Sequence, residues 1–347
     1  MPMEFIQFFA RMTAGSFLPA VFCAAIQDVL PTVLLIVGLV LFLVVLPALD
    51  IHLIIGYLVY THILKRGVNE DWGRHCSIDE PRHVQMYEEG MAWHERMLPY
   101  CKDVRIQRNG LNLVGEYYDF GSDCCVIFLP GRMESLHYSY YFVQAYEPLG
   151  VNILCIDPRA HGLSDGEYNT VGFEESEDIL SWVRFLTEQC GVKKVLLQGV
   201  CIGAAGGLLA CTNDRCPDAV VGLIGDGLFT NFGESMKEHL IERNKPVFTL
   251  WFIDFWMKRL TGHSMRKGPA DFMPRLDKPL LLIHSRADKY SIPKRTEAMF
   301  ETCPSENKKL VWFDGSEHSM IRYDHTADFD REVLSFARQV FGLQPKD

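Results

Sequence analysis

The sequence has no excess of basic residues. Its 347 residues include 34 Lys and Arg against 44 Asp and Glu, which gives a net charge of −10. A nucleic-acid partner requires a face rich in Lys and Arg that neutralises phosphates. We therefore exclude nucleic acid as a partner of this chain.

Metal-ligand spacing is also missing from the 11 cysteines, which form no C-x-x-C pair and no Cys/His pattern typical of zinc sites. We expect neither a metal nor an organic cofactor. Because the cysteine number is odd, at least one thiol is free unless it pairs with another chain. Cys211 and Cys216 are a pair that an oxidising compartment would bridge, but the whole pattern is not that of a disulfide framework.

Charge is absent from residues 29–49, VLPTVLLIVGLVLFLVVLPAL. As a helix this run is about 30 Å long, the thickness of a hydrocarbon core, so it predicts a transmembrane span. The apolar character continues over 51–64, which indicates a possible second helix. Residues 1–66 are therefore interpreted as a single-pass or hairpin anchor at the cell membrane.

The basic residues around this anchor are unevenly distributed. Lys65, Arg66 and Arg74 follow it, whereas Arg11 alone precedes it. For a single crossing, the asymmetry favours a cytoplasmic location for the large C-terminal part. The missing basic n-region and the length of the apolar run argue against a cleaved signal peptide.

Short apolar runs alternate with amphipathic segments from about residue 101, after a predicted linker helix within 67–100. This rhythm is typical of an α/β domain, here 101–343, with a mostly parallel sheet and helices on both faces. The eight expected strands are 103–108, 112–118, 124–129, 151–156, 194–198, 219–225, 279–284 and 308–313. The main expected helices are 135–148, 173–190, 202–212, 294–302 and 325–341.

One interval, 229–276, breaks the alternation and is rich in aromatic residues, including Trp251 and Trp256. It lies between two expected strands, at the edge of the sheet where ligands bind. We therefore interpret 229–276 as a helical lid.

The sequence Gly199-Val200-Cys201-Ile202-Gly203 follows the apolar run that begins at Val195. It matches the strand, sharp turn and helix of a nucleophile elbow, with cysteine at the usual serine position. The helix N-terminus that follows favours the thiolate form of Cys201. The alternative is a glycine-rich packing turn around a buried core thiol.

An acid and a histidine follow the elbow in the order that a catalytic triad requires. Asp288 comes after the expected strand 279–284, and His318 comes after 308–313. We predict that His318 is the general base and acid and that Asp288 orients it. Asp157 and Asp314 are the substitutes for the acid, and His161 is a weaker candidate for the base because it precedes the nucleophile.

Two backbone amides are the predicted oxyanion donors. The amide of Ile202 directly follows the nucleophile, and the amide of Arg132 lies in the loop after the strand 124–129. The arginine side chain is interpreted as exposed and solvated, with attraction of an anionic group as the alternative.

These segments resemble the α/β-hydrolase superfamily, and most closely its bacterial membrane-anchored, prolyl-oligopeptidase-like serine hydrolases. The resemblance rests on DPRAHGLSDG (157–166), TVGFEESEDI (170–179), GVCIGAAGG (199–207), LLLIHSRADKYSIP (280–293) and GSEHSM (315–320). Cysteine at the elbow is similar to dienelactone hydrolase, whose Cys-His-Asp triad opens an activated lactone. Pro130-Gly131 stands where the family usually has His-Gly.

The resulting hypothesis is a hydrolase that cleaves a carboxylic ester, thioester or lactone through a covalent acyl-enzyme. Thioesters, lactones and activated esters suit a cysteine nucleophile best, because the thiolate is itself a good leaving group. Two alternatives stay open. One is an inactive hydrolase fold that binds a ligand, and the other is a serine-type esterase in which Cys201 replaces a native serine.

Overall fold

The computed structural model describes residues 17–66, 76, 79–132 and 134–344, with side chains from Val29 onward. The chain divides into two compact units, Met1–Ile55 and Gly56–Asp347. Arg11 and Arg74, which the orientation argument used, lie outside the described residues.

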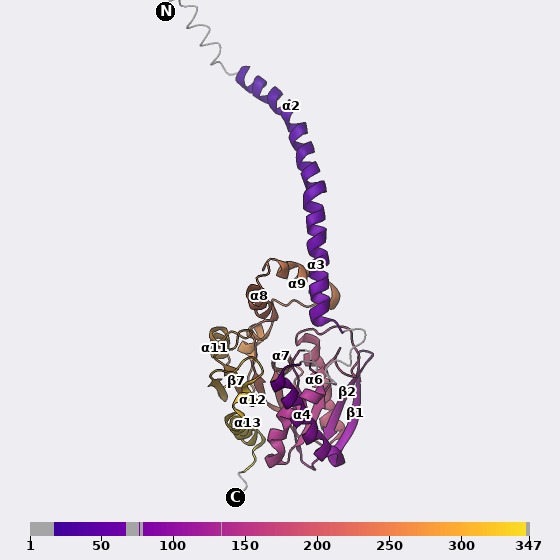
Figure 1. Cartoon of the computed structure of the whole chain (residues 1–347), viewed down its shortest axis with the longest axis vertical. Helices are drawn as coiled ribbons and strands as arrows, with labels where there is room; N and C mark the ends of the chain where they lie inside the picture. Colours follow the sequence, from indigo (N-terminus) through magenta and orange to yellow (C-terminus); the bar gives the residue numbers. More distant parts are fainter. Residues whose placement is uncertain (1–16, 67–75, 77–78, 133, 345–347) are drawn as a thin grey trace, which may run out of the picture. The chain divides into compact units, whose positions relative to one another are not determined.

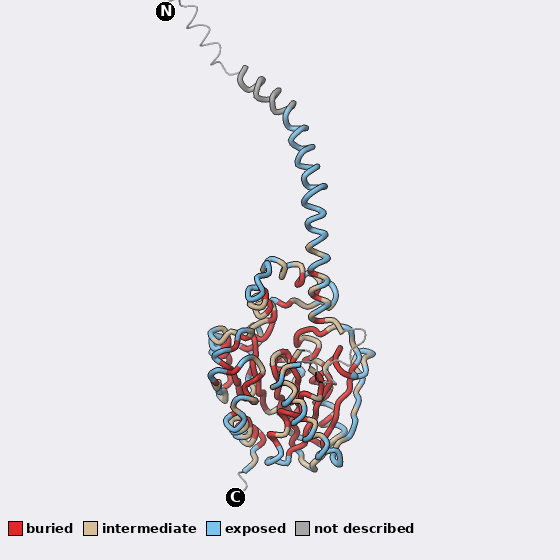
Figure 2. The backbone as a smooth tube through the Cα atoms, in the orientation of Figure 1, coloured by how far each residue is buried: buried red, intermediate tan, exposed pale blue. Residues whose placement is uncertain are grey.

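The N-terminal unit is helical, with α2 (Phe17–Val40), a π-helical turn η1 (Leu41–Val45) and the beginning of α3 (Leu46–Leu64). Among the described residues, one helix is long and apolar enough to cross a membrane. It covers Val29–Leu64 and contains an 18-residue window with a mean hydropathy of 3.1. Residues 29–51 of this helix are all exposed (Figure 2). This helix is therefore a candidate for a membrane span.

The possible second helix over 51–64 is not separate, because these residues continue α3. Proline at position 47 lacks an N–H group and crowds the carbonyl four residues earlier, which normally breaks a helix. Here the π-helical turn η1 precedes it directly, and such turns let a helix accommodate an insertion or a missing hydrogen bond. From Gly56 onward α3 belongs to the second unit, where Tyr60 and Leu64 are buried.

The second unit is built on one eight-stranded sheet with the order β1-β2-β4-β3-β5-β6-β7-β8. The pairs β1–β2 and β2–β4 are antiparallel, and every other pair is parallel. The predicted mostly parallel, eight-stranded sheet is confirmed, and no strand end differs from its predicted position by more than two residues. The strands are β1 (Cys101–Arg108), β2 (Leu111–Tyr118), β3 (Cys124–Leu129), β4 (Asn152–Ile156), β5 (Lys194–Val200), β6 (Val220–Asp226), β7 (Leu280–Ser285) and β8 (Lys308–Phe313).

Both faces of the sheet are covered by helices (Figure 1). Side chains that alternate along β5 enter two different cores, with Val195 and Leu197 in one and Leu196 and Val200 in the other. Helices α6 (Phe173–Gln189), α7 (Ile202–Cys211) and α11 (Pro293–Glu301) contribute to the first core. Helices α4 (Pro81–Met97), α5 (Leu136–Val143) and α13 (Thr326–Phe341) contribute to the second.

Helix α4 lies within 67–100, the segment that was predicted to contain a linker helix. Met86, Gly90 and Trp93 are buried on its inner face. The Trp93 ring lies 4.8 Å from that of Tyr118 in the sheet. A helix that contributes a fully buried tryptophan is a part of the domain core.

The interval between β6 and β7 folds into α8 (Phe232–Glu242), α9 (Thr249–Thr261), α10 (Pro269–Phe272) and η4 (Met273–Arg275). These elements all fall within the predicted lid, 229–276. Helix α9 packs against the C-terminal part of α3, where the rings of Tyr57 and Trp256 meet edge to face at 5.0 Å. The segment therefore forms a helical layer outside the sheet (Figure 1).

Candidate active site

Cys201 lies in the turn between β5 and α7. Its backbone has φ 52° and ψ −113°, a strained conformation for a residue with a Cβ. A Cβ at position 203 would lie 2.0 Å from the carbonyl oxygen of Leu129, and one at position 199 would lie 2.5 Å from the amide nitrogen of Ala204. Only glycine fits at both places. The two glycines therefore hold a half-buried thiol at the C-terminal edge of the sheet.

Asp288 and His318 come together at the same edge. The Nδ1 atom of His318 lies 2.7 Å from Oδ2 of Asp288. The other oxygen, Oδ1 of Asp288, accepts hydrogen bonds from the amides of Tyr290 and Ser291, both at 2.8 Å. The carboxylate therefore caps its own loop and orients the imidazole at the same time.

The imidazole of His318 is packed on two sides. A Cβ at position 227 would lie 3.0 Å from Cε1 of the ring, so Gly227 provides the space behind it. The Tyr290 ring packs against it edge to face at 5.6 Å. The second ring nitrogen, Nε2, is buried and has no hydrogen-bond partner among the described residues. This nitrogen is the atom that a general base requires to be free.

Charges favour the protonated form of this histidine. Burial acts to lower the pKa of His318, but the negative charges of the Cys201 thiolate and of Asp288, together with the Asp288 hydrogen bond, raise it well above its ordinary value. The Cys201 thiol is close enough for its charge to act on the ring. Burial also acts to raise the pKa of Asp288, yet the bond to His318 and the loop amides keep it below its ordinary value.

The substitutes named from the sequence have other contacts. Asp157 accepts hydrogen bonds from the amides of Leu136 and Leu163 at 3.0 and 2.8 Å, so it ties two loops together. Asp314 is exposed. The ring of His161 is buried with Nδ1 2.9 Å from the carbonyl oxygen of Arg159. The structure therefore brings together Cys201, His318 and Asp288 rather than these alternatives.

The loop after β3 holds two charged side chains close to the site. The carboxylate of Glu134 accepts a hydrogen bond from the amide of Gly131 at 2.7 Å, and burial raises its pKa. The side chain of Arg132 is half-buried rather than solvated as predicted. Burial lowers the pKa of Arg132, while the negative charge of Cys201 opposes this effect. The role of the amides of Arg132 and Ile202 as oxyanion donors stays a prediction.

Asp226, the last residue of β6, is a further acidic group at this edge. Its carboxylate is buried, and neither oxygen has a hydrogen-bond partner among the described residues. Burial raises the pKa of Asp226 to about 7, and the nearby charge of His318 only partly opposes this rise. In the sequence, Asp226 lies at the end of an expected strand, next to Gly227. The same feature, an acid after a strand, selected Asp288 as a candidate, so it could also have indicated Asp226.

Asp226→Asn is expected to stabilise the protein at pH 8 and to change little near pH 4. Between an unfolded pKa of about 4 and the folded value of about 7, the folded protein keeps a proton that the unfolded chain loses. Stability therefore falls across this window, by roughly 4 kcal/mol at most. Thermal unfolding of both proteins at pH 5 and pH 8 checks this, with Asp314→Asn as the exposed control. A difference that does not change with pH would contradict it.

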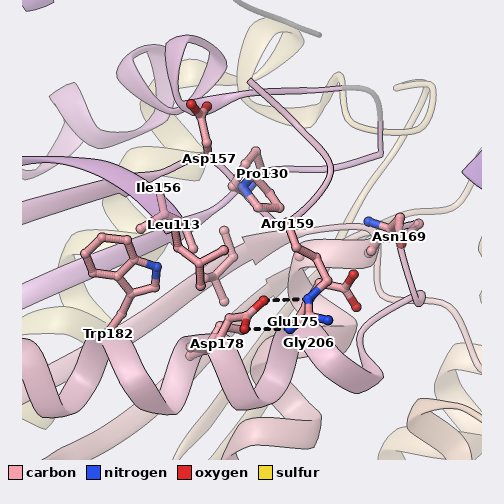
Figure 3. Close-up of a pocket in the computed structure, with 15 residues that line it drawn as sticks. Leu113, Pro130, Ile156, Asp157, Arg159, Asn169, Glu175, Asp178, Trp182 and Gly206 are labelled. Carbon is pink, nitrogen blue, oxygen red and sulfur yellow. Dashed lines mark hydrogen bonds and ion pairs between the residues drawn. The ribbon is translucent and has the colours of Figure 1, made fainter. Parts of the chain in front are cut away.

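A small cavity lies beside the first turn of α7, where Pro130, Ile202 and Gly203 line it. Figure 3 shows polar side chains that also line it, among them Arg159 and Asp178. The cavity volume of about 20 Å³ accommodates roughly one water molecule. Below it, Arg159 forms two bonds of 2.7 Å to the carboxylate of Asp178. The cavity lies behind the nucleophile turn, so we interpret it as part of the support of the elbow.

Three potential metal ligands, which their spacing in the sequence did not reveal, meet elsewhere in the domain. One ligand atom from each of His94, Cys101 and Glu116 lies within 4.8 Å of the others. The hydroxyl of Tyr118 already contacts two of these side chains, 2.6 Å from Nδ1 of His94 and 2.9 Å from Oε2 of Glu116. Tyr140 donates to the same carboxylate oxygen at 2.6 Å. The cluster is therefore a partly buried hydrogen-bond network in which tyrosine hydroxyls contact His94 and Glu116.

Cys211 and Cys216 are both free thiols. The bridge considered for this pair is therefore not formed. Cys211 is buried and Cys216 is half-buried, so the latter serves as a reference thiol for reactivity measurements.

Comparisons with known proteins agree with this fold. A family model described as alpha/beta hydrolase fold matches residues 125–259, which include β3, the elbow and most of the lid. An esterase of Pyrococcus furiosus superposes with a TM-score of 0.60 over 71% of this chain and 94% of that protein, at 22% identity. The chain has the α/β-hydrolase fold.

Two sequence relatives of this α/β-hydrolase-fold protein are named as uncharacterized proteins. The protein YqkD of Bacillus subtilis is 31% identical over 208 residues, 59% of this chain and 66% of the relative, just under two thirds of its length. An uncharacterized membrane protein of Saccharomyces cerevisiae is 24% identical over 247 residues, 69% of this chain and 81% of that protein. These similarities support the fold. The substrate class is inferred below from the chemistry of the site.

Proposed function

We propose that this protein is a membrane-anchored hydrolase that cleaves carboxylic esters, thioesters or lactones with Cys201 as nucleophile. The observation that carries the proposal is the 2.7 Å contact between His318 and Asp288 at the sheet edge that also presents the strained Cys201 turn. A nucleophile, a base and a group that orients the base are the minimum for covalent acyl transfer.

The reaction follows from these groups. Nε2 of His318 accepts the proton of the Cys201 thiol, and the thiolate attacks the carbonyl carbon of the substrate. The amides of Ile202 and Arg132 stabilise the resulting oxyanion. His318 then gives its proton to the leaving alcohol or thiol, which leaves an acyl group on sulfur. Water, deprotonated by His318, attacks this thioester and releases the acid, and the proton returns to Cys201.

Charge around the nucleophile supports this sequence of steps. The pKa of His318 is raised because a thiolate and a carboxylate face the same ring, so the thiolate and the imidazolium stabilise each other. Asp288 remains ionised because the pKa of its carboxyl is lowered. It stabilises the imidazolium that forms during attack. The half-buried guanidinium of Arg132 adds positive charge that acts on Cys201.

The apolar helix Val29–Leu64 would anchor the enzyme in a membrane. Lys65 and Arg66 follow it directly, which favours the cytoplasmic side for the catalytic domain. An acyl substrate of low water solubility suits this location, because the membrane concentrates such molecules at the enzyme.

Trapping of the acyl-enzyme tests the proposal. The full chain is incubated with a p-nitrophenyl ester or a thioester, quenched in acid and digested for mass spectrometry. We expect the peptide that carries Cys201 to gain the mass of the acyl group, and the His318→Ala variant to acylate more slowly. Absence of an adduct, together with an iodoacetamide rate at Cys201 equal to that of Cys216, would reject the proposal.

A ligand-binding protein without catalysis is the second candidate, and one observation favours it. The carboxylate of Glu134 accepts a hydrogen bond from the amide of Gly131. This amide lies in the loop that is expected to stabilise an oxyanion. A negative charge there opposes an oxyanion. The same trapping experiment separates the candidates, because a binding protein forms no thioester at Cys201.

A further inference from the structure

The outer face of α9 exposes large aromatic side chains. Trp251 is 66% exposed and Phe255 is 49% exposed, whereas Ile253 and Met257 on the opposite face are buried. Trp251 and Phe255 are four positions apart, so both lie on one side of the helix. Figure 2 shows exposed, half-buried and buried positions along this helix. Aromatic exposure of this kind on one helix face is a feature of interaction surfaces.

The charge around this face is strongly positive, although the chain as a whole is acidic. Residues 243–267 contain six basic residues and one acidic residue, which gives a net charge of +5 in a protein of −10. The single acid, Asp254, is buried and lies 2.9 Å from Lys258 and 3.4 Å from Arg266. The guanidinium of Arg266 stacks on the Trp251 ring at 4.0 Å. Exposed cations therefore lie in the same segment as the exposed rings, and one of them stacks on Trp251.

Chain connectivity keeps α9 close to the proposed anchor. A Cβ at Gly56 would lie 2.5 Å from Cβ of Phe252, so α3 and α9 are in close contact at this glycine. Only six residues separate Gly56 from Leu49, where the predicted span ends. That segment measures about 10 Å as a helix and at most about 24 Å when extended. The headgroup layer on each side of a bilayer is about 5–8 Å thick.

The same lid layer reaches the candidate active site on its inner side. The ring of His239 in α8 lies 5.5 Å from that of Tyr290, and Tyr290 packs edge to face against His318. The lid therefore has one side at the catalytic groups and one aromatic, basic side turned outward.

We infer that the outer face of α9, with Trp251 and Phe255, docks into the headgroup layer of an anionic membrane. Aromatic rings are favourable at the boundary between headgroups and acyl chains, and basic side chains are attracted to anionic headgroups. The docked lid would present the active site to acyl substrates that enter from the lipid. The inference rests on the proposed membrane-anchored hydrolase and adds the source of its substrate.

Fluorescence quenching tests the docking directly. The full chain is reconstituted in vesicles of phosphatidylcholine, with or without phosphatidylglycerol, that contain a lipid brominated near the headgroup. The emission of Trp251 is obtained as the difference between the wild type and Trp251→Phe. We expect this difference emission to be quenched, and to be quenched more strongly in the anionic vesicles. Emission that is not quenched in either vesicle would overturn the inference. The outer face of α9 would then contact solvent, a second copy of the chain or another part of the same chain.

Turnover separates docking from chemistry. The double variant Trp251→Glu/Phe255→Glu is expected to hydrolyse a long-chain ester embedded in vesicles about tenfold more slowly, because it loses apolar contact with the membrane. Its turnover of a water-soluble short-chain ester is expected to stay unchanged. Leu98→Glu, at a site that is 52% exposed at the end of α4, is the matched control. Equal turnover of the embedded ester by the double variant and the wild type would contradict the inference. Failure of the catalytic proposal shows separately, as soluble-ester turnover that survives in Cys201→Ala.

Discussion

Cys201→Ala is expected to lower kcat for a p-nitrophenyl or thioester probe by a factor of about 10⁴ or more. Without the sulfur there is no atom to form the acyl-enzyme, so only weak stabilisation by the oxyanion donors remains. The smaller alanine side chain fits the turn, because the close contacts at the elbow are made at Gly199 and Gly203. The fold should therefore survive, and the loss should be in chemistry alone.

The control for this variant is Cys216→Ala, which removes a half-buried thiol away from the site. Its kcat should equal that of the wild type, and both variants should unfold at similar temperatures. An alanine variant at position 201 that remains fully active would contradict a nucleophilic role. Cys201→Ser is informative in a different way, since a gain of activity on ordinary esters would favour a protein in which cysteine has replaced serine.

The sheet could be predicted closely from the sequence because its signals are local. Each buried strand is a short apolar run, and the turns after β5, β7 and β8 carry their functional residues in a fixed order along the chain. The positions of Cys201, Asp288 and His318 at one sheet edge follow from that order, because parallel strands end at the same edge. No long-range information was needed for these three residues.

The errors arose where burial depends on distant parts of the chain. From the sequence, Arg132 was predicted to be a solvated surface residue. In the structure, the loop after β3 folds back and half-buries Arg132 beside Cys201. Glu134 reaches the amide of Gly131 only because this loop is tight. The contact of His94, Cys101 and Glu116 joins α4 to two strands, and no spacing along the chain encodes it. Such tertiary effects cannot be derived from periodicity.

Asp288→Asn is expected to lower kcat/KM for the same probes by about 10²- to 10⁴-fold. The asparagine oxygen can still accept the amides of Tyr290 and Ser291, which hold the loop at 2.8 Å. The amide nitrogen then replaces Oδ2, the atom 2.7 Å from Nδ1 of His318. A donor at this place favours the imidazole tautomer with its proton on Nε2, which cannot accept the proton of the thiol.

A comparison with the neighbouring acid, Asp226, shows which carboxylate orients His318. Asp226 is also buried near His318 but does not bond to it, so Asp226→Asn removes a carboxylate and leaves the orienting contact in place. Steady-state kinetics from pH 5 to 9 should show the large loss in Asp288→Asn, and the iodoacetamide rate at Cys201 should fall with it. A loss confined to Asp226→Asn would transfer the orienting role to the end of β6. Retained activity in both variants would mean that His318 needs no carboxylate, since the buried imidazolium would then be stabilised by the thiolate alone.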